Sequence, residues 1–403
     1  MSVCLSQLRL SLQLVSLFRG VKQSPALCAL LRILQAADAD EKAAAYSDFL
    51  FALQAADLCF SEALLRLVFT DDNRYVRLTA AKEPIPEAME ALAERELSLF
   101  SALTELSPED LFPDALPAGG IPADGGRFAC TLPRFENKKT DVGALYRARL
   151  SQLHRFGFGV FAGGAMFRVK DERIVPIRTD SAMSPDEFVG YQSQRETVRR
   201  AFVSLLDGMP AENVLLYGDA GTGKSSTVKA LVKDLADRGL RLIELKKDQL
   251  TDLPAVMEEV RVQPLKFVIF IDDLSFGKND DQFSMLKAAL EGSAAGTAEN
   301  ALICATSNRR HIVKETFSDR TGDDVHRNDT MTELLSLSDR FGLTVYYEKP
   351  NKAQYLETVS VLAARAGLPV TEELLTAAEA YALKKGSRSP RAAKQFVAIE
   401  KSL

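Results

Sequence analysis

The hydrophobic positions of the first 108 residues recur with the spacing of helices. Leucine and alanine repeat every three or four positions through Leu27–Leu34, Ala43–Ala56 and Ala88–Leu103, and few runs alternate as strands do. This spacing places the apolar side chains of each segment on one helical face. We therefore expect an all-α N-terminal domain over residues 1–108. It carries no catalytic constellation, so we interpret it as a scaffold or partner-binding module.

The helical pattern stops between residues 107 and 133, where proline and glycine crowd the chain. Such a stretch predicts a loop and a domain boundary. A helical pattern returns over residues 141–154. The residues from Gly157 to Val169 and from Arg173 to Ile177 then predict a small β-hairpin. We expect residues 109–185 to form a linker that carries this helix and hairpin.

From residue 186 onwards, short apolar runs alternate with helical patterns. We expect strands at 214–217, 241–245, 266–271, 300–308 and 344–347, with helices between them. Strands that alternate with helices predict a parallel sheet with helices on both faces. The chain is helical again from residue 350. The sequence thus predicts an α/β domain over 186–349 and a helical domain over 350–403.

The junction between the strand at 214–217 and the next helix carries a binding motif. Residues 218–225 read Gly-Asp-Ala-Gly-Thr-Gly-Lys-Ser, which is the pattern of a phosphate-binding loop between a strand and a helix. The glycines let backbone N–H groups point at a polyphosphate. Lys224 supplies positive charge to the β- and γ-phosphates, and the Ser225 hydroxyl can ligate Mg²⁺. The nucleotide-binding residues that we expect are Gly218, Asp219, Ala220, Gly221, Thr222, Gly223, Lys224, Ser225 and Ser226.

Polar side chains end the two apolar strands that follow. Asp272 and Asp273 close one strand, and Asn308 closes the next. Ligands of α/β sheets lie at the carboxyl ends of the strands, where these side chains are expected to meet. We predict that Asp272 holds Mg²⁺ together with Ser225. Asp273 is the candidate general base or water-orienting group, and Asn308 can position the attacking water. The structural alternatives are a loop cap for Asp273 and a plain turn residue for Asn308.

Two arginines are further candidates. Arg340 precedes the last strand, and there it can reach a nucleotide held by a neighbouring subunit and offset charge in the transition state. The alternative is a surface pair with Asp339. Arg391 lies in the first turn of the last helix, from which it can contact the phosphates. Arg388 is its competitor for that role.

The composition bears on the cellular compartment and the binding partners of the protein. The net charge of −5 over 403 residues gives no general footprint for nucleic acid or an anionic membrane. No apolar run approaches the roughly 20 residues needed to span a bilayer. The five cysteines are scattered, which is typical of buried reduced thiols in a cytosolic protein. We expect a cytoplasmic protein without a membrane partner.

The order of these motifs resembles the AAA+ P-loop ATPases across residues 186–403. The amino-acid sequences of the motifs are similar to those of a bacterial family of AAA+ ATP-binding proteins known as domain of unknown function 815. The resemblance implies an AAA+ core over 186–349, a helical lid over 350–403, and ATP and Mg²⁺ as cofactors. It also implies that Asn308 is sensor 1, Arg340 the arginine finger and Arg391 sensor 2. The stretches that carry the resemblance are Asn213–Ser226, Phe270–Phe276, Leu286–Gly292, Ala305–His311, Leu335–Leu343 and Ser389–Phe396.

Two departures from the AAA+ pattern bear on function. Many AAA+ motors end this strand with Asp-Glu, whereas this chain has Asp272-Asp273. The Asp-Asp form is similar to that of replication initiators and helicase loaders, which fits slow turnover. AAA+ unfoldases also carry an aromatic–hydrophobic–glycine pore loop after the second core strand. Residues 245–265 contain no aromatic residue and no glycine, which argues against a motor that threads polypeptides.

The function expected from these features is an ATPase that assembles into an oligomer and slowly hydrolyses Mg·ATP. It would remodel, load or switch a macromolecular partner recruited by residues 1–108. One alternative is a nucleotide-gated binding module with little turnover. Another is a helicase-loader-like ATPase associated with DNA, suggested by the Asp-Asp form and by a basic end of the helical domain. A small-molecule kinase is disfavoured, because a kinase has no need of Asn308, Arg340 and Arg391 together.

Overall fold

The computed structural model describes residues 5–112, 132–177, 185–274, 286, 290, 298–308 and 340–402. The chain divides into two compact units, residues 1–163 and 164–403. Several stretches discussed above lie outside the described residues: most of the proline- and glycine-rich loop (113–131), and 275–276, 287–289, 291–292, 309–311 and 335–339 of the family resemblance.

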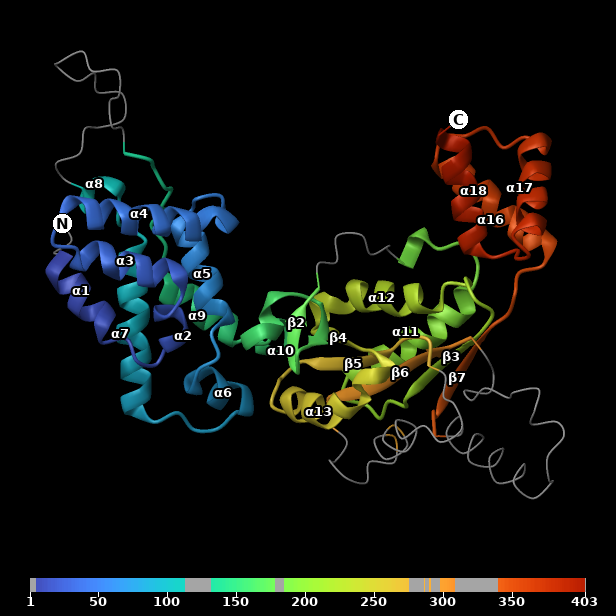
Figure 1. Cartoon of the computed structure of the whole chain (residues 1–403). Coiled ribbons are helices and arrows are strands. Elements are labelled where there is room, and N and C mark those ends of the chain that lie inside the picture. Colours follow the sequence, from blue (N-terminus) through green and yellow to red (C-terminus); the bar gives the residue numbers. More distant parts are fainter. Residues whose placement is uncertain are drawn as a thin grey trace, which may run out of the picture. The chain divides into compact units, whose positions relative to one another are not determined.

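The first unit is helical, as the sequence predicts. Its α-helices are α1 (Leu5–Gln13), α2 (Arg19–Lys22), α3 (Pro25–Gln35), α4 (Ala39–Leu53), α5 (Phe60–Thr70), α6 (Arg74–Ala81), α7 (Glu87–Leu103), α8 (Pro108–Leu111), α9 (Val142–Leu150) and α10 (Leu153–Phe156). Figure 1 draws them from blue to green. A cluster of aromatic rings fills the core, and Phe49 contacts both Phe60 and Phe135 edge-on. Tyr146 of α9 contacts Phe18 edge-on. The helix predicted at 141–154 therefore packs into this unit and does not belong to a separate linker.

A buried carboxylate joins two distant parts of the first unit. Glu96 on α7 is 1% exposed and accepts backbone N–H groups from Ser16 at 2.8 Å and Phe18 at 2.9 Å. These N–H groups lie just before α2, where a helix leaves its first donors unpaired. A charged acceptor at a helix N-terminus is favourable, so Glu96 stabilises this turn.

The second unit is built on a seven-stranded sheet. The strands are β1 (Met166–Lys170), β2 (Arg173–Pro176), β3 (Val214–Gly218), β4 (Leu240–Leu245), β5 (Lys266–Ile271), β6 (Ala301–Ser307) and β7 (Leu343–Tyr347). Their order is β2-β1-β4-β5-β6-β3-β7. Neighbouring strands are parallel except for the antiparallel pair of β1 and β2. The five core strands predicted from the sequence are all present.

The predicted β-hairpin forms, with two differences from the sequence analysis. It begins at Met166, because Gly159–Gly163 forms a 3-10 helix, η2. It also belongs to the main sheet, since β1 pairs in parallel with β4 through Arg168 and Glu244. The expected linker 109–185 is thus divided, with its helix in the first unit and its hairpin in the second.

Helices cover both faces of the sheet. Helices α11 (Gln192–Leu206) and α12 (Lys224–Leu235) pack on one face, where Phe202, Val228 and Leu231 meet apolar side chains of six strands. Helix α13 (Leu253–Arg261) lies on the opposite face (Figure 1). The C-terminal helices α16 (Lys352–Arg365), α17 (Glu372–Lys384) and α18 (Pro390–Ser402) form a bundle around Tyr355 and Phe396. The α/β core, the C-terminal helical domain and the helical N-terminal region predicted from the sequence are thus all present in the structure.

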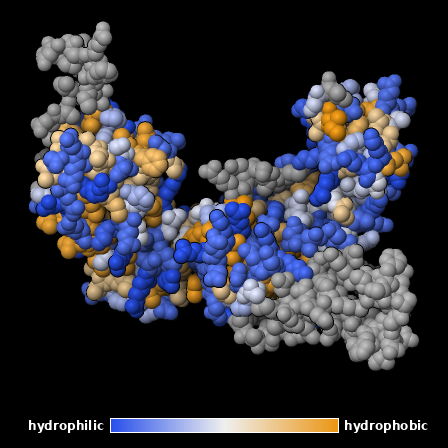
Figure 2. All heavy atoms as spheres, in the orientation of Figure 1, coloured by the Kyte–Doolittle hydropathy of each residue, from blue (hydrophilic) through white to orange (hydrophobic). Residues whose placement is uncertain are grey.

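The surface and the cysteines complete the description. On the face shown in Figure 2, apolar residues are scattered among hydrophilic ones. In the described part of the chain, none of the helices has the length and hydrophobicity to cross a membrane. Cys59 and Cys304 are buried as expected, but Cys28 is exposed, which corrects the prediction of buried thiols. Cys4 and Cys130 lie outside the described residues.

Candidate functional site

The phosphate-binding loop joins β3 to α12. Gly218 has φ +133°, and a Cβ there would collide with the carbonyl of Tyr347 on the neighbouring strand. Gly221 has φ +80°, and a Cβ would lie 3.0 Å from the Ser389 hydroxyl of the lid. These two glycines are therefore required both by conformation and by close approach. The loop passes tightly between the sheet edge and the lid.

Lys224, the first residue of α12, is 6% exposed. Its ammonium group donates to the carbonyl oxygens of Gly218 and Asp219, both at 2.8 Å, and to Oδ1 of Asn308 at 3.1 Å. Burial lowers the pKa of Lys224 below its ordinary value, opposed by the carboxylates of Asp219, Asp273 and Asp272. The ammonium is thus held by neutral acceptors in the middle of the loop. An anionic phosphate oxygen is a stronger acceptor than a carbonyl.

Asp272 follows the end of β5, and its carboxylate accepts hydrogen bonds from two hydroxyl groups. Ser225 and Thr306 each donate to its Oδ1 at 2.6 Å. Among the described residues, Oδ2 of Asp272 has no hydrogen-bond partner, so this oxygen can turn to a cation. A carboxylate and a hydroxyl in contact are the hard oxygen ligands that Mg²⁺ takes alongside waters and phosphates. The donor set therefore fits Mg²⁺, with Ser225 and Asp272 as the protein ligands.

Asp273 turns away from the strand in the left-handed region, with φ +53°. Its backbone N–H donates to Oγ1 of Thr306 at 2.9 Å, and its Oδ1 accepts from Nδ2 of Asn308 at 2.6 Å. Asn308 thereby links Lys224 to Asp273 through the two ends of one amide. Aspartate tolerates a positive φ better than most residues, which suits Asp at this position.

The two lid arginines are distinguished by their contacts. Arg388 forms an ion pair with Glu379 on α17, with Nη2 and Oε1 2.5 Å apart. Arg391 lines the cavity above the phosphate-binding loop, and its backbone N–H donates to the carbonyl of Gly221 at 3.3 Å. The structure therefore brings Arg391, and not Arg388, to the candidate site.

The cavity between the core and the lid has a volume of about 490 Å³, which is within the ~300–1,000 Å³ of ordinary ligand pockets. Its polar lining includes the loop from Ala220 to Ser226 together with Asp272, Asp273, Asn308 and Arg391. Phe188, Val189 and Leu362 contribute apolar surface to the same cavity. A molecule with a flat apolar part and a polyanionic part matches this mixed lining.

Arg340 does not line this cavity, unlike the other predicted catalytic residues Asp273, Asn308 and Arg391. It is half-buried just before β7. The structure of one chain thus brings together every predicted catalytic and metal-binding residue except Arg340.

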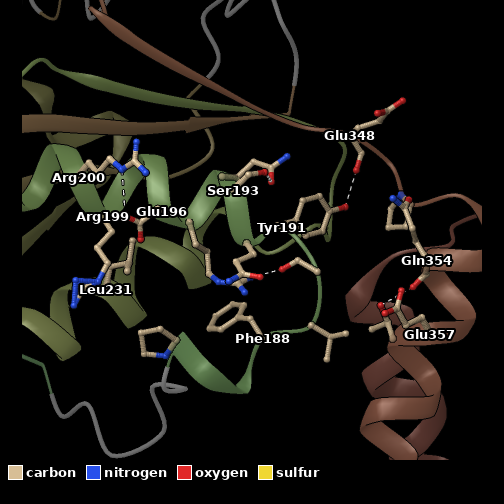
Figure 3. Close-up of a pocket in the computed structure, with 18 residues that line it drawn as sticks. Phe188, Tyr191, Ser193, Glu196, Arg199, Arg200, Leu231, Glu348, Gln354 and Glu357 are labelled. Carbon is tan, nitrogen blue, oxygen red and sulfur yellow. Dashed lines mark hydrogen bonds and ion pairs between the residues drawn. The ribbon is translucent and has the colours of Figure 1, made fainter.

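A larger groove of about 1210 Å³ adjoins the cavity and shares Phe188, Val189 and Tyr191 with it. Figure 3 shows its walls, formed by the start of α11 and by α16 of the lid. The Tyr191 hydroxyl donates to the carbonyl of Glu348 at 2.6 Å, which ties the start of α11 to the segment that leads into the lid. Burial raises the pKa of the Tyr191 hydroxyl well above its ordinary value. This phenol therefore stays protonated and remains a donor.

Several residues that line the cavity were not predicted as site residues, among them Phe188, Arg195, Thr306 and Lys394. Phe188 and Arg195 stack on each other, with 5.5 Å between the guanidinium carbon and the ring centroid. A signal for Thr306 was present, since it lies two residues before Asn308 and so on the same face of the strand. Lys394 is three residues after Arg391, which places it on the same side of α18. No local signal marked Phe188 or Arg195.

The fold and the site can now be set beside known proteins. A family profile described as a protein of unknown function, DUF815, matches residues 164–401. The chain belongs to this family. The DUF815 match begins at the residue where the second compact unit begins and includes every residue of the candidate site. No curated protein matches the sequence.

Solved structures give weak likenesses to about half of the chain. The Thermotoga maritima RuvB Holliday junction branch migration motor is 17% identical, with a TM-score of 0.36, over 53% of this chain and 63% of that one. A DNA replication initiation factor is 16% identical, with a TM-score of 0.36, over 54% and 64%. The FIGL-1 AAA domain in complex with ADP is 17% identical, with a TM-score of 0.33, over 49% and 66%. This chain thus spans less than two thirds of each of these structures.

Proposed function

We propose that this DUF815 protein binds Mg·ATP and slowly hydrolyses it to ADP and phosphate, in order to remodel, load or switch a macromolecular partner. The observation that carries the proposal is the hydrogen-bonded cluster at the carboxyl ends of β5 and β6. It joins Lys224 to Asn308 and Asp273, and Ser225 to Asp272. A phosphate-binding lysine, a metal-binding pair and a second carboxylate stand within one cavity. Phosphoryl transfer to water needs these parts and little else.

Each side chain of the cluster has a role in this proposal. Lys224 exchanges its loop carbonyls for the β- and γ-phosphates, and Ser225 and Asp272 hold Mg²⁺, which neutralises phosphate charge when bound. Asp273 accepts the proton of the attacking water or orients that water. Asn308 keeps Asp273 and the water in line. Arg391 contacts the phosphates from the lid, and the apolar lining residues Phe188, Val189 and Leu362 contact the base.

The direct test is hydrolysis of ATP by the purified chain, with Asp273→Asn as the key variant. The variant should bind ATP with near-native affinity while its kcat falls about 10²- to 10⁴-fold, the usual contribution of a general base. Asp252→Asn, at the start of α13, is a matched control that should hydrolyse ATP normally. If Mg²⁺-dependent hydrolysis is absent from the native protein, the proposed enzyme activity is wrong.

Arg340 enters the proposal through a second copy of the chain. Its absence from the cavity of its own chain supports a role at the site of a neighbour in an oligomer. A mixture of Arg340→Ala and Lys224→Ala chains tests this, because some interfaces would pair an intact loop with an intact arginine. Each variant alone should be inactive and the mixture should regain activity. An Arg340→Ala protein with native activity would remove the role in trans.

A nucleotide-gated binding module is the second candidate, and one contact favours it. The lid rests on the loop itself, through the Arg391 N–H and the Gly221 carbonyl and through Ser389. Movement of the loop on ATP binding would thus reach the lid without any turnover. Capture of partners by Asp273→Asn held in ATP separates the two candidates. Full partner binding and biological activity without hydrolysis would favour the gated module.

The role of the N-terminal unit belongs to the same proposal. We infer that this helical unit recruits the partner and that the protein works in the cytoplasm. Parallel capture with a chain that lacks residues 1–163, where the first compact unit ends, tests the recruitment.

The DNA-associated alternative rests on the basic end of the lid. Two arginines at this end of the lid are already engaged, since Arg388 is paired with Glu379 and Arg391 lines the cavity. Fewer cations are therefore left to contact a DNA backbone than the sequence indicates. A binding assay with single- and double-stranded DNA at low salt tests this alternative, since phosphate contacts weaken steeply with salt.

A further inference from the structure

One side chain contacts both members of the acidic pair. Thr306 on β6 is 2% exposed. Its hydroxyl donates to Oδ1 of Asp272 at 2.6 Å and accepts the backbone N–H of Asp273 at 2.9 Å. The metal-binding carboxylate and the backbone of the candidate base therefore meet at a single oxygen atom.

The direction of these two hydrogen bonds is fixed by the chemistry of the groups. A hydroxyl carries one proton and two lone pairs. The Asp273 N–H can only donate, so it takes a lone pair of Thr306. The carboxylate of Asp272 can only accept, so it takes the proton. The hydroxyl is satisfied in both senses, and its orientation is determined from both sides.

The first consequence concerns Asp272. Its Oδ1 is anchored by Thr306 from the sheet and by Ser225 from α12. If Ser225 and Asp272 hold Mg²⁺, the Thr306 hydroxyl would still anchor Oδ1 of the carboxylate from the sheet, and Oδ2 would be available as a ligand. Groups that hydrogen-bond to a metal-binding side chain commonly set its orientation in this way.

The second consequence concerns Asp273. Its positive φ is an unfavourable backbone conformation that the surroundings must hold. Two backbone contacts to Thr306 do so, since the Asp273 N–H meets the Thr306 hydroxyl and the Leu274 N–H donates to the Thr306 carbonyl at 2.7 Å. The turn that directs the Asp273 carboxylate towards Asn308 is thereby built on one residue.

We propose that Thr306 is a positioning residue for Mg·ATP hydrolysis, which holds Asp272 for the metal ion and Asp273 for the attacking water. This inference rests on the proposed function of the site. Its distinctive content is that one hydroxyl couples metal binding to the placement of the base. Loss of that hydroxyl therefore affects both, whereas ATP binding without Mg²⁺ depends on Lys224 and the loop and is unaffected.

The test compares Thr306→Val with Thr306→Ser. Valine has the shape of threonine without the hydroxyl, and serine keeps the hydroxyl without the methyl group. The matched control is Thr104→Val in the N-terminal unit. Thr104 is 1% exposed, and its hydroxyl likewise both donates, to the carbonyl of Ser101 at 2.7 Å, and accepts, from the Thr140 N–H at 2.9 Å. Thr104→Val therefore removes a buried hydroxyl that donates one hydrogen bond and accepts another, in the compact unit that does not contain the acidic pair.

Three quantities are measured for each full-length protein: the dissociation constant for ATP in EDTA, the Mg²⁺ concentration that half-maximally tightens ADP binding, and kcat for ATP. In Thr306→Val, we expect native ATP affinity in EDTA and a rise of about 10- to 100-fold in the Mg²⁺ requirement. A fall of similar size in kcat should accompany it. Thr306→Ser should restore both, and Thr104→Val should lower only Tm.

Each outcome bears on the inference. A folded Thr306→Val protein with a native Mg²⁺ requirement would overturn it. So would a Thr306→Ser protein as defective as Thr306→Val, because the methyl group and not the hydroxyl would then matter. If the native protein binds Mg·ADP but does not hydrolyse ATP, the proposed function fails while the Mg²⁺ requirement still tests Thr306.

Discussion

The side-chain amide of Asn308 donates to the carboxylate of Asp273 at 2.6 Å, while its oxygen accepts the ammonium of Lys224 at 3.1 Å. The candidate base and the phosphate-binding lysine are therefore connected through one neutral amide. If a phosphate accepts the hydrogen bond of Lys224, Oδ1 of Asn308 loses its donor, while Nδ2 of Asn308 still donates to Asp273. This is a direct route by which the occupancy of the loop reaches the base.

Replacement of Asn308 by alanine removes both contacts. We expect kcat to fall about 10²-fold, as on loss of one preorganised donor, because Asp273 and the water lose their common partner. ATP affinity should change little, since Lys224 and the loop still bind the phosphates. Steady-state hydrolysis and an ATP titration measure the two effects. A native kcat would mean that Asn308 is only a turn residue.

Replacement of Lys224 by alanine should weaken ATP binding. Loss of a charge-assisted contact to phosphate costs about 1.5–3 kcal/mol, so the dissociation constant should rise about 10- to 150-fold. Lys229→Ala is the control on the same helix, because Lys229 pairs with Glu244 at 3.0 Å and does not line the cavity. Fluorescence titration with an ATP analogue measures both proteins. Equal weakening in the two variants would contradict the assignment of Lys224.

The two lid arginines should give opposite results. Arg391→Ala should weaken ATP binding or lower kcat about tenfold, because a cation is removed from the cavity. Arg388→Ala should leave ATP binding unchanged and lower Tm, because its contact is with Glu379 inside the lid. Thermal unfolding and ATP titration of both variants distinguish the roles. The reverse pattern would assign Arg388 to the nucleotide.

Tyr347 predicts a loss of stability in alkali. The ring is fully buried, and burial raises the pKa of its hydroxyl from the ordinary value of 10.0 to about 12. The folded state binds this proton more tightly than the unfolded chain does. The stabilisation is therefore complete below pH 10 and is lost as the pH rises towards 12.

Between pH 9 and pH 11 this one group should cost about 1.4 kcal/mol. Tyr347→Phe keeps the ring without an ionisable group, so it should lose that much less stability over the same interval. Urea unfolding at the two pH values measures the difference. Equal losses in the two proteins would show that the phenol does not control alkaline stability.

Local chemistry explains what the sequence could predict. The phosphate-binding loop, the buried strands and the polar residues at their ends are encoded in short stretches. The parallel arrangement then brings those ends together, so Lys224, Ser225, Asp272, Asp273 and Asn308 were all placed near one another in advance.

The remaining features depend on contacts between distant residues. The choice between Arg388 and Arg391 turned on Glu379, nine residues before Arg388, which captures that guanidinium. The contacts of Thr306 required the register between β5 and β6. The pairing of β1 with β4 joins residues 76 positions apart, Arg168 and Glu244. Short-range sequence patterns do not predict such a pairing.

The hairpin of β1 and β2 has a consequence for any separated form of the second compact unit, residues 164–403. Without it, β4 (Leu240–Leu245), which is rich in leucine and isoleucine, would be an outermost strand with a row of unpaired N–H and C=O groups at its edge. Such an edge invites pairing with other chains and aggregation. The hairpin ends the sheet instead with a short strand that carries Arg173 and Pro176, residue types that resist further pairing. Residues 164–177 therefore protect β4 from pairing with strands of other molecules.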